Sequence, residues 1–385
     1  MAQDRLGSKD NNLMDSDFNG AELLDELHAL LISYVVLPSP EAADAVTLWI
    51  AATHGQRAWE HAPRLRIGSP IKRCGKTRLL EVIEYTCHGA ISTVDATIAA
   101  LFRSIDDDDP PTLVVDEADA IWAKKNAEGT EDLRKLLNAG FGRGRSVLRC
   151  VGPTQQVQPF ATFAMAAIAG IGDMPDTVTD RAVNVIMRRR ALTETVQPFR
   201  RRRDRPALLK IKGDLARWVY SRLDALRDAV PDMPVEDRAA DVWEPLIAIA
   251  DEAGGTWPER ARKACTKLSK EADTEDTERT TSLQLLSDLR AIFDNEEADR
   301  LWTKVVLEDL RRLDGSPWGE WFGRLFNDRD LSNILRPYGV RPVDVKVMGQ
   351  VPKGYRRDHL HEVWARYLPP KKEAETDESA ESSGE

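Results

Sequence analysis

The residues best suited to chemistry are Gly75-Lys76-Thr77 and the carboxylate pair Asp116-Glu117, with Asp116 40 residues after Lys76. A lysine at the start of a helix binds phosphate together with backbone N–H groups, and a threonine hydroxyl and a carboxylate suit Mg²⁺. A glutamate beside the metal ligand could act as the general base that polarises an attacking water. The set predicts hydrolysis of ATP with Mg²⁺.

The stretch around Lys76 has the layout of a phosphate-binding loop between a strand and a helix. An apolar run ends at Ile67, small and basic residues follow, and a helical pattern runs from Lys76 to about Tyr85. The usual first glycine of the motif is replaced by Pro70, and Gly68 lies two residues before that position. The residues expected to contact nucleotide are Ser69, Pro70, Arg73, Cys74, Gly75, Lys76, Thr77 and Arg78.

Asp116 and Glu117 follow Thr112–Val115, a continuous, largely apolar run of the buried parallel type. An Asp-Glu pair alone is most often a solvated surface pair. The strand before it and the loop upstream favour a metal site, in which Thr77 and Asp116 hold Mg²⁺ and Glu117 activates water. The strand and helix predicted between the two motifs are typical of a P-loop ATPase with an inserted strand.

Strands and helices alternate after the loop, which predicts an α/β fold with a doubly wound parallel sheet. The expected strands are 90–94, 112–115, 162–169 and 182–187, and the expected helices are 76–85, 96–105 and 131–141. The full division is a disordered N-terminus (1–18), N-terminal helices (19–62), a P-loop, AAA-like core (63–200), a helical lid (201–270), an acidic linker (271–281), a winged-helix-like domain (282–368) and a disordered acidic tail (369–385).

Composition narrows the class of protein. The chain has 385 residues, 42% hydrophobic and 31% charged, with a net charge of −10. Neither a membrane span nor a signal peptide is visible, so we expect a cytoplasmic protein without a membrane partner. The four cysteines form no Cys-x-x-Cys pair, which argues against a zinc site or disulfide framework, and Cys74 is interpreted as a small packing residue.

Several arginines could act on a phosphate. Arg181 precedes the last core strand, where ring-forming ATPases place an arginine finger that acts across subunits; a salt-bridged arginine at a strand edge is the alternative. Arg143, Arg145 and Arg149 lie in a glycine-punctuated basic hairpin that could face DNA in a central pore, supply the finger or be a solvated loop. Arg238, at the start of a lid helix, is a possible nucleotide sensor.

Residues 282–368 predict helices followed by a basic hairpin, as in a winged helix, which reads DNA with its third helix and its wing. The segment 300–368 has thirteen Lys/Arg against nine Asp/Glu. Winged helices also bind proteins, so both uses stay open. The cations expected to contact DNA are Arg336, Lys346, Lys353, Arg356 and Arg357.

The chain resembles a poorly characterised family of P-loop ATPases common in actinobacteria, phages and integrated elements. The resemblance rests on Trp49-Ile-Ala-Ala-Thr-His54, Arg73-Cys-Gly-Lys-Thr-Arg-Leu-Leu80, Val114-Val-Asp-Glu-Ala-Asp119, Ala239-Ala-Asp-Val-Trp-Glu-Pro-Leu246 and Lys353-Gly-Tyr-Arg-Arg357, and covers roughly residues 40–368. Ser-Pro usually starts the loop in that family, so Pro70 fits it. The family often accompanies or is fused to primase-polymerase domains, which implies a replication helicase or a related AAA-type motor.

Three hypotheses follow. The first is a DNA-dependent ATPase, a helicase or translocase of a phage or mobile element, that forms a ring, expected to be a hexamer, and works with a primase or another replication partner. The second is a nucleotide-switched DNA-binding initiator or regulator. The third is an ATPase that acts on protein partners in phage defence.

Overall fold

The computed structural model describes residues 18–92, 98–106, 108–118, 128–151, 156–172, 174–313, 316–321, 323–346 and 351–368. The chain divides into two compact units between residues 272 and 273. The predicted disordered segments, apart from Phe18, lie outside the described residues. None of the helices in the described part of the chain is both long and apolar enough to cross a membrane.

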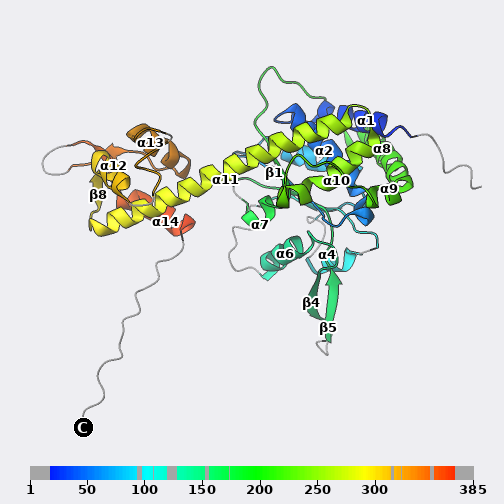
Figure 1. The fold of residues 1–385 in the computed structure, drawn as a ribbon, viewed down its shortest axis with the longest axis horizontal. Helices are drawn as coiled ribbons and strands as arrows, with labels where there is room; N and C mark the ends of the chain where they lie inside the picture. The colour runs from blue at the N-terminus through cyan, green and yellow to red at the C-terminus, as the bar shows by residue number, and fades with distance from the viewer. Residues whose placement is uncertain are drawn as a thin grey trace, which may run out of the picture. The chain divides into compact units, whose positions relative to one another are not determined.

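A five-stranded parallel sheet forms the core of the first unit, as predicted (Figure 1). Its order is β2-β3-β6-β1-β7. The strands are β1 (Arg64–Gly68), β2 (Ile91–Ser92), β3 (Leu113–Val115), β6 (Ala166–Ala169) and β7 (Ala182–Ile186). All residues of β1, β3 and β6 are buried, as expected for strands covered on both faces. Strand β6 therefore separates β1 from β3.

Two strands are shorter than predicted. Strand β2 covers Ile91–Ser92, and the rest of the expected strand 90–94 beyond it is outside the described residues. Strand β6 begins at Ala166 instead of Thr162. The backbone N–H of Met165 donates to the side chain of Gln56 at 2.7 Å, while its carbonyl accepts the N–H of Leu113 from β3 at 2.9 Å. The N–H of Met165 is therefore taken by a side chain, and the strand begins one residue later, at Ala166.

Helices cover the sheet. In the first unit they are α1 (Gly20–Tyr34), α2 (Pro40–Thr53), α3 (Lys76–Thr86), α4 (Ile98–Ser104), α6 (Glu128–Ala139), α7 (Asp176–Thr179), α8 (Arg201–Ser221), α9 (Leu223–Arg227) and α10 (Asp237–Ala253). One hydrophobic cluster runs through the N-terminal helices, the sheet and helices α8 and α10. The segments 19–62, 63–200 and 201–270 thus share a single core, and the N-terminal helices are not a separate domain.

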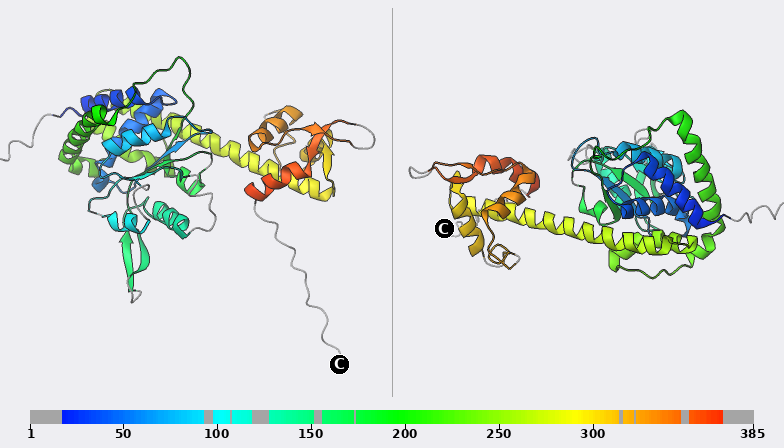
Figure 2. Two further views of the ribbon diagram at one scale, coloured as in Figure 1. Left: turned by 180° about the vertical axis from the view of Figure 1, so that it is seen from behind. Right: turned by 90° about the horizontal axis from the view of Figure 1, so that it is seen from above.

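A two-stranded antiparallel hairpin projects from the first unit (Figures 1 and 2). Its strands are β4 (Ser146–Val151) and β5 (Gln156–Ala161), with Leu148 opposite Pro159. Phe160 and Arg149 contact the ring of Phe102 on α4, so one face of the hairpin is anchored. Leu148 and Val157 are 67% and 63% exposed.

Residues 271–281, predicted as an acidic linker, contain the boundary between the two units and lie inside one long helix, α11 (Trp257–Asn295). The segment contains no glycine or proline. Each threonine or aspartate there costs a helix only about 0.5–0.7 kcal/mol relative to alanine, whereas a glycine or proline would cost about 1–3 kcal/mol, so charge alone does not break the helix. Residues 258–270 and 282–294, on either side of this segment, therefore belong to a single helix.

The second unit combines helices with a three-stranded antiparallel sheet of order β8-β10-β9. Its elements are β8 (Arg300–Trp302), α12 (Thr303–Arg312), α13 (Asp328–Leu335), β9 (Val343–Asp344), β10 (Lys353–Arg356) and α14 (Arg357–Tyr367). Trp318 and Phe326 are fully buried in its core. Asn327 starts α13 with a capping box to Asp330, which stabilises the short helix.

Candidate functional site

The loop between β1 and α3 has a backbone of unusual geometry. Gly75 caps α3 with φ +88°, and Arg73 has φ +66°. A non-glycine residue in this region is uncommon and is tolerated only where its surroundings enforce it. Since Gly75 has no side chain, the first N–H groups of α3 are left for a ligand or water. The loop therefore presents an uncapped helix end.

Lys76 crosses this loop to a side chain at the end of β1. Its ammonium donates a 2.6 Å hydrogen bond to the hydroxyl of Ser69, and that hydroxyl donates to the carbonyl of Ile71 at 2.8 Å. Ser69 is 3% exposed, whereas Lys76 is only half-buried. The lysine is thus positioned at the loop by one neutral partner.

Two neighbouring strands brace the base of the loop. After β6, the N–H of Gly172 donates to the carbonyl of Ser69 at 3.1 Å. After β7, the N–H of Met187 donates to the carbonyl of Gly68 at 2.7 Å. Asp173, the polar residue nearest to the end of β6, lies outside the described residues. The segments after three adjacent strands thus meet at one edge of the sheet.

Asp116 and Glu117 lie at this same edge, because β3 is parallel to β6 and β6 is parallel to β1. Asp116 is half-buried and its carboxylate accepts the N–H of Glu117 at 2.8 Å. Glu117 is exposed and has φ +52°. Strained backbone of this kind clusters at functional sites, and here it turns Glu117 out of the strand direction.

The chemistry of these side chains fits ATP with Mg²⁺. Lys76 and the α3 N-terminus supply positive charge for phosphates, and Thr77 and Asp116 supply the hard oxygen ligands that Mg²⁺ prefers. Thr77 is exposed. Among the described residues no group of three or more His, Cys, Asp or Glu side chains could hold a metal.

The remaining loop residues have more local roles. Cys74 is 5% exposed and its thiol lies 3.2 Å from the carbonyl of Ile71, in keeping with a packing residue. Pro70 is exposed. Arg78 pairs with Glu81 and lies over the ring of Phe199, 4.8 Å from its centroid. Because Glu81 already holds its guanidinium, Arg78 is less suited to phosphate than Lys76.

Arg181 and Arg238 lie at the opposite edge of the sheet. Arg181 immediately precedes β7, and its carbonyl accepts the N–H of Arg64, the first residue of β1. Arg238 contacts Asp180, its Nη1 3.6 Å from the Asp180 carboxylate. The loop follows the other end of β1, so Arg238 lies away from the loop of its own chain.

The three hairpin arginines differ in their surroundings. Arg143 donates to the carbonyls of Trp59 and Gln56 and lies 4.1 Å from the centroid of Phe163. Arg149 pairs with Asp132 as well as contacting Phe102. Both side chains hold the fold together, which corrects their prediction as DNA contacts. Arg145 is exposed, so it stays a candidate for contact with DNA.

Carboxylates neutralise most of the predicted cations of the second unit. Lys353 lies 2.8 Å from Asp344, Arg356 pairs with Asp358, and Arg357 lies 2.7 Å from Asp294 while donating to the carbonyl of Ala298. Arg357 is therefore structural. Arg336 and Lys346 are exposed.

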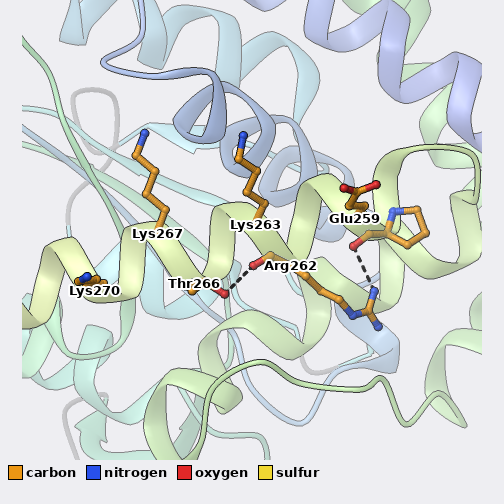
Figure 3. Close-up of a pocket in the computed structure, with 7 residues that line it drawn as sticks. Glu259, Arg262, Lys263, Thr266, Lys267 and Lys270 are labelled. Carbon is orange, nitrogen blue, oxygen red and sulfur yellow. Dashed lines mark hydrogen bonds between the residues drawn. The ribbon is translucent and has the colours of Figure 1, made fainter.

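A basic row on α11 forms a shallow pocket but not a second site (Figure 3). Lys263 and Lys267 bind the carboxylate of Glu41 at 3.0 and 2.7 Å, and Arg262 binds Asp251. These lysines lower the pKa of Glu41 to about 2. The charges of these three cations are thus matched by carboxylates that join α11 to α2 and α10.

Sequence reasoning missed the hydroxyl of Ser69 as the partner of Lys76, and it missed Phe141 beneath Arg181 and Arg238. Phe141 is 5% exposed, and both guanidinium groups lie over its ring. Nothing in a single sequence joins residues so far apart. The Ser-Pro start of the loop was the available signal for Ser69.

Comparisons with known proteins give relatives of unknown activity. The profile of a family described as a protein of unknown function, DUF3631, matches residues 186–367, which lie after the loop and the Asp116-Glu117 pair. An uncharacterised 28.9 kDa protein in the xis 5′ region of Saccharopolyspora erythraea is 42% identical over 187 residues, 48% of this chain and 69% of that protein.

Two solved structures of the NrS-1 C-terminal region, both apo A forms, are similar at TM-scores of 0.35 and 0.32. Each is 13% identical and covers 90% of this chain, which spans 79% and 78% of those chains. A likeness this loose carries no argument about fold or function.

Proposed function

The chain belongs to the family of the uncharacterised 28.9 kDa protein in the xis 5′ region of Saccharopolyspora erythraea, and we propose that it is a P-loop ATPase that works on DNA. The resemblance to P-loop ATPases of phages and integrated elements supports this proposal. So does the xis 5′ region in the relative's name, which accords with a mobile-element setting. The AAA-like, ring-forming helicase or translocase is the specific form that we propose.

One observation carries the proposal. Lys76, at the start of α3, and Asp116-Glu117, at the end of β3, lie at the same edge of a parallel sheet. Ligands of open α/β sheets bind outside the carboxyl ends of the strands. The two motifs that the sequence separates by 40 residues therefore share the side of the sheet where a nucleotide would bind.

Each residue then has a defined part in hydrolysis. Lys76, held by the Ser69 hydroxyl, neutralises the β- and γ-phosphates with its other N–H donors, while the N–H groups at the start of α3 bind phosphate oxygens. Thr77 and Asp116 would hold Mg²⁺, which offsets phosphate charge when bound. Glu117 orients and polarises the attacking water. Arg181 would add positive charge at the γ-phosphate of a neighbouring subunit.

DNA is the substrate that we propose for the motor. Arg145 stands exposed at the base of the hairpin, and exposed cations bind the phosphate backbone irrespective of base sequence. In a ring, the Arg145 side chains of several subunits would together contact one DNA strand in the central pore. A primase or another replication partner is proposed from the resemblance alone.

The second unit favours a second candidate, a nucleotide-switched DNA-binding protein. Its helices and its β8-β10-β9 sheet follow the chain order expected of a winged helix. Arg329, Asn333 and Arg336 are exposed along α13 and the turn after it, whereas Leu331 and Leu335 are buried. A helix with such an outward face could enter a DNA groove. This candidate shares the ATP site but predicts slow turnover.

Nucleotide binding and turnover separate these candidates. We expect the purified protein to bind ATP with Mg²⁺, and Lys76→Ala to abolish binding while its unfolding midpoint stays unchanged. Single-stranded DNA that accelerates hydrolysis would support the motor. Tight, ATP-dependent binding of duplex DNA without stimulated turnover would favour the switch. Absence of any ATP binding by the wild-type protein would refute both.

A further inference from the structure

Arg181 and Arg238 converge on one aromatic ring. Their guanidinium carbons lie 5.8 and 5.7 Å from the centroid of Phe141, and His61 stacks on the same ring at 5.1 Å. Arg181 comes from the turn between α7 and β7, whereas Arg238 comes from the first turn of α10. The fold thus brings two guanidinium groups from distant segments to one place.

These like charges are only loosely compensated. Asp180 and Asp241 lie 3.6 and 3.7 Å from Arg238, which is beyond hydrogen-bond distance. Both carboxylates are more than a third exposed, so water screens them strongly. Burial first, and then the charge of Arg238, lower the pKa of Arg181. An anion placed against the pair would relieve this repulsion.

The pair lies too far from the loop of its own chain to serve it. Arg181 precedes the first residue of β7, which pairs with Arg64, and the loop begins after Gly68. Four residue steps along a strand span about 13 Å, and the loop lies further on. A phosphate bound at Lys76 is therefore beyond reach of either guanidinium group.

We propose that Arg238 acts with Arg181 as a two-guanidinium site for the terminal phosphate of ATP bound to a second copy of this chain. This rests on the proposed ATPase activity. Each planar guanidinium group can donate paired hydrogen bonds to phosphate oxygens. Arg238 is 42% exposed and Arg181 is half-buried, so both can meet a partner. Asp180 and Asp241 release Arg238 when the phosphate arrives.

A nucleotide fits this cluster better than a nucleic-acid backbone. The charge of Arg145 also acts on Arg181, but Asp180 and Asp241 stand beside Arg238 and interrupt the row of cations that a backbone track needs. The two guanidinium groups converge on a single ring, which suits one compact anion. The carboxylates would repel a long polyanion on either side.

Mixing two inactive variants tests this inference. Arg238→Ala keeps an intact loop, and Lys76→Ala keeps intact arginines. We expect Arg238→Ala alone to lower ATP turnover by about 10- to 100-fold, less than the 10³ or more of a full arginine finger. Equal mixtures should recover about a quarter of wild-type turnover. In random assembly, about one subunit contact in four joins an intact loop on one copy to both arginines on its neighbour.

Two further variants control for unspecific effects of substitution and for loss of folding. Arg227→Ala, an exposed arginine paired only with Asp224 in the described structure, should keep wild-type turnover. Arg238→Gln, which keeps a stem over Phe141, replaces Arg238→Ala if the latter unfolds. An active wild type with no recovery in mixtures overturns the inference, as does a fully active Arg238 variant. A wild type without turnover instead defeats the proposed ATPase function itself.

Discussion

The ammonium of Lys76 donates a 2.6 Å hydrogen bond to the hydroxyl of Ser69, which closes the loop between β1 and α3. The same hydroxyl donates to Ile71 and the carbonyl of Ser69 accepts from Gly172. Ser69 therefore connects the lysine to the loop and to the end of β6. In the proposed ATP site, Ser69 holds Lys76 where its other N–H donors can meet phosphate.

Removal of this hydroxyl should weaken nucleotide binding without unfolding the protein. Ser69→Ala loses the partner of Lys76 and the bond to Ile71, at about 1 kcal/mol for each net hydrogen bond. We expect the Kd for ATP, measured by calorimetry, to rise about 5- to 30-fold. Ser69→Thr keeps the hydroxyl and serves as the control. Equal affinity of Ser69→Ala and wild type would contradict the role of Ser69.

Glu117→Gln should separate binding from turnover. The amide keeps the size of the carboxylate but cannot accept the proton of the attacking water, so we expect turnover to fall by about 10²- to 10⁴-fold. ATP affinity should stay within about threefold, since Lys76 and Thr77 are untouched. Phosphate release and nucleotide binding measure the two effects. Glu60→Gln, at an exposed position, is the matched control, and wild-type turnover by Glu117→Gln would remove its assigned part.

Arg143 and Arg145 should behave differently although they are two residues apart. Arg143→Ala leaves two carbonyls without their donor and removes the contact with Phe163, so we expect a loss of about 2–3 kcal/mol in urea unfolding. Arg145→Ala should change stability by less than about 0.5 kcal/mol but reduce DNA-stimulated hydrolysis. Unchanged stimulation would rule out Arg145 as a DNA contact.

His54 should make the first unit sensitive to mild acid. Its side chain is buried and its Nε2 lies 2.9 Å from the carbonyl of Thr86, and burial lowers its pKa to about 3. The unfolded chain, with a pKa near 6.5, binds more protons between these values, so stability falls as pH falls from about 6.5. We expect a loss of about 2 kcal/mol by pH 5.

Denaturant unfolding at pH 7 and pH 5 measures this loss. His54→Gln should be less stable at pH 7 but should flatten the pH dependence over that interval. His359→Gln, at an exposed histidine of the second unit, should leave the dependence unchanged. A wild type equally stable at both pH values would contradict the burial of a neutral His54.

The sheet was predictable because β3 is an apolar run and β1 and β7 lie close to motifs and turns. The start of β6 was not, since the bond from Met165 to Gln56 joins residues 109 positions apart. The helix through residues 271–281 was missed because their charge was interpreted as that of a solvated linker, although the segment has no glycine or proline. Local sequence shows propensity, whereas neighbours decide where an element ends.

The candidate site divides in the same way. Lys76, Thr77, Asp116 and Glu117 were found from spacing, because loop, helix and strand are local patterns. The contacts of the arginines were not, since Arg143 and Arg149 point to backbone carbonyls, a carboxylate and rings that tertiary packing supplies. A basic run in sequence thus contained two structural residues, Arg143 and Arg149, beside the exposed Arg145.

Steady-state ATP hydrolysis with Mg²⁺, on protein sized by light scattering and with or without single-stranded DNA, tests the central claim most directly. We predict an oligomer that hydrolyses ATP, faster with DNA, and loses this activity in Lys76→Ala and Glu117→Gln. A monomer that neither hydrolyses nor binds ATP in any of these conditions would contradict the account.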